Sequence, residues 1–290
     1  MEYYFDDSRL KRGDFITHIE GKPVEAIIDS MKKYYPASNE AARMRDIARD
    51  ILRTDKQSIQ IDYISSGKKE RKEIYLGSRD EWMYYRYRRK DTTRCYQFIG
   101  KDIGYVSLKN IKGDDIPAIK QKFMNTKGII IDIRNYPSAN VMYTLGAYFV
   151  SNTTPFVKFT KGNPDNPGEF TFKSKNDIPK SETTYQGKLV VIVNEETQSS
   201  AEFQAMAFQA GDNTTVIGST TAGADGNVSE IDLPGGLKTN ISGVGVYYPD
   251  GRETQRVGIV PDIVVKPTII GIREGRDELL EKAIEIIRQE

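Results

Sequence analysis

A serine hydroxyl stands between a run of apolar residues and a run of strong helix formers. Residues 189–193 read Leu-Val-Val-Ile-Val, which is typical of a strand buried on both faces of an α/β sheet. Residues 194–198 form a short polar turn, and residues 201–209 contain neither Gly nor Pro. Ser199 therefore lies where a strand is expected to end and a helix to begin. The unpaired N–H groups of a first helical turn favour negative charge, so the pattern indicates a nucleophile beside an oxyanion hole.

The local sequence is equally typical of a helix cap. Serine is a preferred N-cap residue, and Glu202 follows Ser199 by three positions, as in a capping box. From these residues alone, a purely structural role for Ser199 stays open.

A longer resemblance favours the chemical role. Residues 191–228, with Asn-Glu-Glu-Thr-Gln-Ser-Ser-Ala-Glu at 194–202 and Val-Ile-Gly-Ser-Thr-Thr-Ala-Gly at 216–223, resemble the active-site segment of the carboxyl-terminal processing serine peptidases. That family includes the tail-specific proteases and the core of tricorn protease. The resemblance continues through residues 248–251 and 257–263. It implies a crotonase-like (ClpP-like) fold, cleavage of peptide bonds, and Ser199 as the nucleophile.

The resemblance also implies where the oxyanion is held. One N–H would come from Ser200, directly after the nucleophile. The other would come from a turn that usually reads Asn-Pro-Gly-Gly in relatives. Here Ser138 and Ala139 replace the two glycines. A backbone N–H is harder to aim into a tight site without Gly, but Ser138 remains the expected second donor.

The general base of the family has no matching residue in this chain. Relatives carry a Lys after Phe-Gly, where this chain has Ala224 after Ala-Gly, and their supporting Asp falls here on Ala210, with Asp212 nearby. In the tricorn branch the base is a His near the first catalytic strand. The chain's single histidine, His18, lies instead in the amino-terminal segment, and we expect it not to be catalytic. Lys109, expected at the end of the first catalytic strand, is the candidate base.

The pattern of strands and helices predicts an α/β protein of two domains. Residues 1–78 resemble the PDZ segment of the family, a peptide-binding module, with a strand in which Phe15, Ile16 and Ile19 feed the core, helices within 27–53 and two strands around a turn at 65–68. Residues 79–290 form the catalytic domain, with strands at 103–108 and 128–134 around a helix at 114–125. Residues 159–179, rich in Pro and Gly, are expected to form a long surface loop.

Composition narrows the function classes. The 42 basic and 41 acidic residues nearly cancel, which argues against nucleic acid as the main partner. A stretch at 82–90 alternates basic and aromatic residues, and we interpret it as a linker strand with a solvated basic face rather than an RNA or DNA site. One cysteine and one histidine can form neither an intrachain disulfide nor a His/Cys metal site, and no cofactor is expected.

The remaining expectations concern location and partners. The sequence contains no apolar run long enough to span a bilayer, and its start lacks the features of a signal peptide. The resemblance nevertheless implies a periplasmic or cell-envelope protein whose leader is missing from this chain. The expected partner is a peptide or protein substrate, and the sequence gives no oligomeric state.

Two hypotheses follow. The chain is either a serine peptidase with an atypical or relocated base, or a catalytically inactive pseudoprotease that binds peptides or acts as a scaffold.

Overall fold

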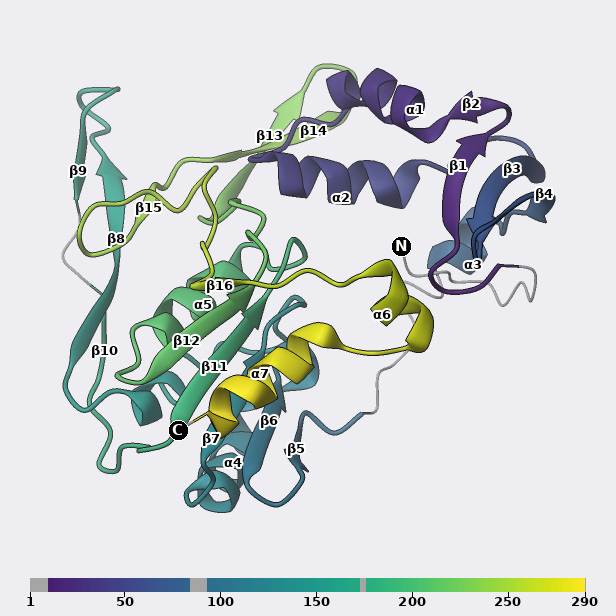
Figure 1. The fold of residues 1–290 in the computed structure, drawn as a ribbon. Coiled ribbons are helices and arrows are strands. Elements are labelled where there is room, and N and C mark those ends of the chain that lie inside the picture. The colour runs from purple at the N-terminus through teal and green to yellow at the C-terminus, as the bar shows by residue number, and fades with distance from the viewer. Residues whose placement is uncertain (1–9, 84–92, 173–175, 290) are drawn as a thin grey trace. The chain divides into compact units, whose positions relative to one another are not determined.

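The computed structural model describes residues 10–83, 93–172 and 176–289. Two compact units are present, one comprising residues up to 92 together with 266–278, the other residues 93–265 together with 279–290 (Figure 1). The expected domain boundary after residue 78 stays a prediction.

The first unit is built on an antiparallel sheet of order β2-β1-β3-β4. Its strands are β1 (Phe15–Ile19), β2 (Lys22–Pro23), β3 (Ser58–Ser65) and β4 (Lys68–Tyr75), and its helices are α1 (Val24–Met31), α2 (Glu40–Asp50), α3 (Arg79–Met83) and α6 (Ile269–Glu274). The core contains Ile19 and Ile61, as the alternation along β1 and β3 requires. Phe15 is 55% exposed, so the prediction that it feeds this core is wrong.

The second unit is organised around a six-stranded sheet of order β16-β12-β11-β7-β6-β5. The strands are β5 (Tyr96–Ile99), β6 (Ile103–Ser107), β7 (Gly128–Asp132), β11 (Lys188–Val193), β12 (Thr214–Gly218) and β16 (Ile263–Val264). All neighbours are parallel except β5 and β6. The predicted strands at 103–108, 128–134 and 189–193 are confirmed, each to within two residues at its end.

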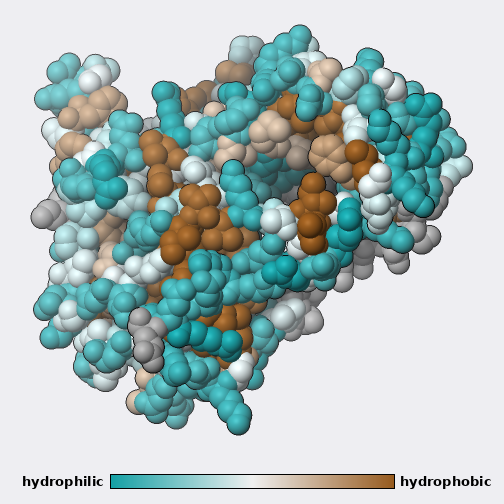
Figure 2. Space-filling view, viewed as in Figure 1, coloured by the Kyte–Doolittle hydropathy of each residue, from teal (hydrophilic) through white to brown (hydrophobic). Residues whose placement is uncertain are grey.

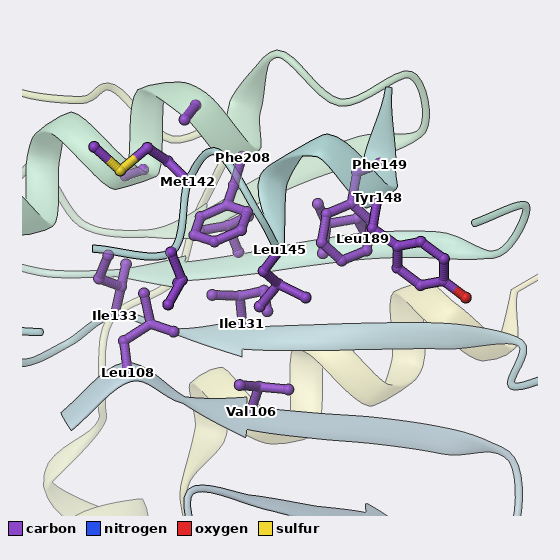
Figure 3. Close-up of a cluster of buried hydrophobic side chains, with 14 of the residues drawn as sticks. Val106, Leu108, Ile131, Ile133, Met142, Leu145, Tyr148, Phe149, Leu189 and Phe208 are labelled. Atoms are coloured by element: carbon purple, nitrogen blue, oxygen red, sulfur yellow. The ribbon is translucent and has the colours of Figure 1, made fainter. Parts of the chain in front are cut away.

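Helices cover both faces of this sheet. Side chains alternate along β7 and β11, so that Ile131 and Val191 belong to one apolar cluster and Ile130 and Val190 to another. The first cluster packs against α4 (Ile116–Phe123) and α5 (Ser200–Gln209), the second against α7 (Glu278–Arg288). Figure 3 shows Val106 and Ile131 of the sheet on the side where Phe208 of α5 lies. Burial on both faces explains why the central strands read as continuous apolar runs.

A second, antiparallel sheet occupies much of the predicted long loop. It contains β8 (Thr154–Gly162), β9 (Phe170–Phe172), β10 (Asn176–Ile178) and β15 (Val246–Tyr247). The prediction of a loop over residues 159–179 is therefore wrong for most of its described length. Among the described residues of this range, the Pro- and Gly-containing tip at 163–169 and Pro179 lack regular structure.

A hairpin of β13 (Val228–Leu233) and β14 (Leu237–Ser242) completes the unit. All twelve strand residues are exposed. On the face of the molecule seen in Figure 2, apolar residues gather in separate patches on a mainly hydrophilic surface. The described helices include none that is both long enough and apolar enough to cross a membrane. Residues 84–90 of the basic and aromatic stretch lie outside the described residues, so its solvated face stays a prediction.

Candidate active site

Ser199 occupies a strained turn between β11 and α5. Its φ and ψ angles are 55° and −119°, whereas most non-glycine residues keep φ negative. Such a conformation costs on the order of 1–3 kcal/mol and persists only where the surrounding structure enforces it. The preceding turn is held on both sides, because Thr197 Oγ1 donates to Ile133 O at 2.8 Å and Ala222 N donates to Thr197 O at 3.0 Å. Ser199 therefore lies at the end of a buried strand, where its sequence context predicts it.

The buried carboxylate of Glu202 fixes this turn. Glu202 is 1% exposed, and its Oε2 accepts from Ser199 N at 3.1 Å and from Ala224 N at 2.9 Å. Its Oε1 accepts from Gly223 N at 2.7 Å and from the hydroxyl of Thr221. Burial raises the pKa of Glu202, and these four hydrogen bonds oppose the rise without cancelling it. The capping interaction thus exists, but it holds the backbone of Ser199 and the segment after β12 together.

Helix α5 also holds the loop that follows β7. Gln204 is buried, and its Oε1 accepts from Val141 N at 2.9 Å while its Nε2 donates to Ala139 O at 3.1 Å. Ser200 Oγ donates to Asn140 Oδ1 at 3.0 Å. Helix α5 therefore carries Ser200 and also binds the loop that follows Ser138. These are the two segments that were expected to hold an oxyanion.

Ser138, the expected second oxyanion donor, makes local contacts in this conformation. Its N–H donates to Leu108 O at 3.0 Å, and its hydroxyl donates to Ile111 O at 2.5 Å. Ser138 therefore has to release Leu108 before its N–H can bind an oxyanion, and its role stays a prediction. Ser200 is the first residue of α5. Its N–H is among the four in a first turn that have no partner within the helix.

The two candidate bases from the sequence lie in different surroundings. Lys109 is exposed on the short 3-10 helix Leu108–Asn110 that follows β6. His18 lies on β1 of the first unit, where its Nδ1 is 3.1 Å from Thr17 Oγ1 and 3.9 Å from Asp62 Oδ2. Asp212, the acidic residue near the position of the family's supporting Asp, accepts from Ser151 N at 2.8 Å.

The sequence predicts no role for Asp225. This residue is 7% exposed, and its Oδ1 accepts from Gly226 N at 2.7 Å. Burial, with the negative charge of Glu202 as a smaller contribution, raises the pKa of Asp225 to about 7. The sequence pattern gave no sign of this environment, because Glu202, whose charge acts on Asp225, and Gln255, which donates to Asp225 O, lie far from Asp225 along the chain. Among the described residues, no group of three or more His, Cys, Asp or Glu side chains is placed to hold a metal ion.

Comparison with proteins of known fold agrees with this arrangement. The chain is similar over 99% of its length to the structure of mature CPAF complexed with lactacystin, with a TM-score of 0.74, 15% identity and 79% of that chain covered. It is also similar to a structure from Parabacteroides merdae described as that of a candidate peptidase, with a TM-score of 0.61, 19% identity, and coverage of 91% of this chain and 89% of that one. At these identities, the likeness shows the fold.

Sequence comparison identifies the family. The chain is 23% identical over 180 residues to the carboxyl-terminal-processing protease of Synechocystis sp., which covers 60% of this chain and 40% of that protein. It is 29% identical over 115 residues to a protein of Chlamydia trachomatis, of which it covers 19%. The chain thus spans less than half the length of these relatives. The sequence model described as peptidase family S41 matches residues 102–265, which contain β6, β7, β11 and the whole Ser199 site. The chain therefore belongs to peptidase family S41, a family of serine peptidases.

Proposed function

We propose that this chain is an active serine-type endopeptidase of the carboxyl-terminal processing kind, with Ser199 as its nucleophile. One observation carries the proposal, namely that Ser199 adopts a strained conformation with positive φ at the junction of β11 and α5. A simple N-cap has extended backbone angles, so capping alone does not account for the strain. Strain of this kind clusters at active sites, where it aims a group at its target.

In the proposed reaction, Ser199 Oγ attacks the carbonyl carbon of a peptide bond and forms an acyl-enzyme. The Ser200 N–H would stabilise the oxyanion, joined by the Ser138 N–H after its bond to Leu108 O opens. Lys109 remains the base predicted from the sequence. In the catalytic unit it follows β6, which is separated from β11 by β7. The carboxyl ends of these parallel strands share one edge of the sheet, the edge at which open α/β sheets collect their sites.

The second candidate function is that of a catalytically inactive pseudoprotease that binds peptides. It is favoured by the observation that the Ser138 N–H is already bonded to Leu108 O and that Lys109 is exposed. Under this hypothesis, the Ser199 turn has a structural role and no catalytic one.

The other parts of the chain receive roles by analogy. We infer a crotonase-like fold for the catalytic unit and a PDZ-like role for the sheet and helices of the first unit, which would take up an extended peptide. Family membership implies a protein substrate. A periplasmic or cell-envelope location is proposed from the resemblance to exported carboxyl-terminal processing proteases.

Covalent labelling tests the proposal. A serine-directed fluorophosphonate is expected to modify Ser199 of the intact chain, and Ser199→Ala to abolish both labelling and peptide cleavage. Ser229→Ala is the matched control, because Ser229 is exposed on the β13–β14 hairpin. Labelling at another serine would contradict the assignment, and absence of labelling would favour the pseudoprotease.

A further inference from the structure

Asp225 is a buried carboxyl with an unsatisfied oxygen. It is 7% exposed, and only one of its two oxygens, Oδ1, accepts a hydrogen bond, from Gly226 N. The other, Oδ2, is buried and has no hydrogen-bond partner in the described part of the chain. Buried polar atoms are nearly always paired, and each exception calls for an explanation. An oxygen of this kind has the capacity to accept a proton from a neighbouring group.

Hydrogen bonds bring Ala224, the residue before Asp225, close to Ser199. The N–H groups of Ser199 and Ala224 donate to the same oxygen, Glu202 Oε2, at 3.1 and 2.9 Å. The two backbone nitrogens are thus separated by no more than two hydrogen-bond lengths, and Asp225 is the next residue after Ala224.

The strand order gives Asp225 an advantage over Lys109. Asp225 follows β12, which is the direct neighbour of β11, the strand that leads to Ser199. Lys109 follows β6, with β7 between β6 and β11. Two interstrand spacings separate β6 from β11 by roughly 10 Å. β12 is therefore closer to β11 in the sheet than β6 is.

Residues 255 and 256 also hold the segment that carries Asp225 in place. Gln255 Nε2 donates to Asp225 O at 2.8 Å and to Val244 O at 2.9 Å, and Arg256 N donates to Gly223 O at 2.7 Å. A Cβ atom on Gly226 would lie 2.8 Å from Val244 O, so the chain packs tightly here. Asp225 is held in place by backbone contacts that leave its Oδ2 uncommitted.

The charged surroundings favour a carboxyl that titrates. Glu202 on α5 is the ionisable group whose charge acts on Asp225, and it raises the pKa of Asp225 together with the larger effect of burial. Gln255, which packs against the segment from the other side, is neutral, and the Arg256 contact is made by a backbone N–H. With a pKa of about 7, Asp225 changes its charge in the range where a general base is most effective.

We propose that Asp225, rather than Lys109, is the proton acceptor for Ser199, which rests on the proposed peptidase function. In the reacting complex, Asp225 Oδ2 takes the proton from Ser199 Oγ as Oγ forms its bond to the substrate carbonyl carbon; the two atoms are not hydrogen-bonded in the free chain. The carboxyl then gives this proton to the amide nitrogen as the C–N bond breaks, which leaves an acyl ester on Ser199. Water hydrolyses the ester by the same exchange, and Asp225 ends as a carboxylate.

The proposal fixes the direction of the pH dependence. Asp225 accepts a proton only in its ionised form, so the reaction of Ser199 should speed up as pH rises through the pKa of Asp225. A mere structural role for Asp225 would give no such inflection.

The test combines rates with a direct titration. The second-order rate of fluorophosphonate labelling at Ser199 is measured from pH 5 to 9 in the intact chain and in the Asp225→Asn, Asp225→Glu and Lys109→Met variants. Asp232→Asn is the matched control, because the Asp232 side chain is 83% exposed. The carboxyl carbon of Asp225 is followed by 13C NMR over the same range. We expect the rate and the Asp225 resonance to share one inflection near pH 7, and Asp225→Asn to slow labelling at pH 8 by about 100-fold or more.

Two results overturn the inference in distinguishable ways. If the intact chain is labelled at Ser199 and Asp225→Asn keeps both the rate and the inflection, the role of Asp225 fails while the peptidase proposal stands. The role of Asp225 also fails if only Lys109→Met abolishes labelling. If the intact chain is neither labelled nor able to cleave peptides at any pH, the proposed function itself fails. Asp225→Glu keeps the charge but moves it, so partial retention of the rate with a shifted inflection supports the proposal even if Asp225→Asn folds poorly.

Discussion

At the scale of single residues, Ser199 combines an unfavourable backbone with a reactive side chain. Its φ of 55° is tolerated by Gly but strains any residue with a Cβ atom. We predict that Ser199→Gly unfolds at a higher temperature than Ser199→Ala, with a free energy of unfolding larger by about 1 kcal/mol. Both variants lack the hydroxyl, so both should be inactive.

Thermal and urea unfolding of the two variants measure this difference. Ser229→Gly and Ser229→Ala form the control pair, because Ser229 lies in an exposed strand where Gly should be the less stable residue. Equal stability of the two Ser199 variants would show that the turn is not strained.

Glu202 is the residue on which the geometry of the site depends. Its two oxygens accept from three backbone N–H groups and one hydroxyl. In Glu202→Gln, one oxygen becomes an NH2 group that faces N–H donors. We expect a loss of about 2–4 kcal/mol in the free energy of unfolding and loss of Ser199 labelling.

Urea unfolding provides the measurement, and Glu230→Gln on the exposed hairpin is the matched control. A stable, fully reactive Glu202→Gln variant would contradict the view that this carboxylate joins Ser199 to residues 223–224.

At the scale of elements, α5 supports the site through Gln204. This side chain pairs with Val141 N and Ala139 O, both in the loop after β7. Gln204→Met keeps the volume but leaves these backbone groups without their partner. We predict a loss of about 1–3 kcal/mol in the free energy of unfolding and slower labelling of Ser199.

Gln186→Met is the control for Gln204→Met, because Gln186 is exposed and donates to Thr184 O only two residues away. If both variants lose the same stability, the link from α5 to the loop contributes nothing specific.

The elements also show what sequence patterns can predict. Continuous apolar runs predicted β7 and β11 because a strand buried on both faces must be apolar throughout. The strands β8 and β9 were missed because most of their residues are at least partly exposed and they flank a Pro- and Gly-containing tip. Ser199 was predicted from its place between strand and helix. Asp225 was not, since its surroundings include Glu202 and Gln255, which lies 30 positions away.

At the scale of the whole molecule, Asp225 links stability to pH. Its pKa rises from an ordinary value of 3.8 to about 7 on folding. The folded state therefore binds a proton more tightly than the unfolded state between these values. Its stabilising effect is fully present below about pH 4 and is lost as pH rises through about 7. The chain should lose about 3 kcal/mol of stability between pH 5 and pH 8 from this group.

Urea unfolding at pH 5 and pH 8 measures this loss of stability. Asp225→Asn should abolish the loss, so that, relative to the parent chain, the variant is more stable at pH 8 than at pH 5. Asp232→Asn is expected to keep the parent's pH dependence, because Asp232 is exposed. An unchanged pH dependence in Asp225→Asn would show that Asp225 is ionised in the folded chain throughout this range.

The most direct test of the central claim is to trap the acyl-enzyme. The intact chain is mixed with an activated ester substrate, quenched with acid within milliseconds to seconds, and examined by intact-mass and peptide-mapping mass spectrometry. We predict one acyl group per chain, attached to Ser199, forming in a burst and absent from Ser199→Ala. An acyl group on a different residue, or turnover of the ester by Ser199→Ala at the parent rate, would contradict the assignment of Ser199 as the nucleophile.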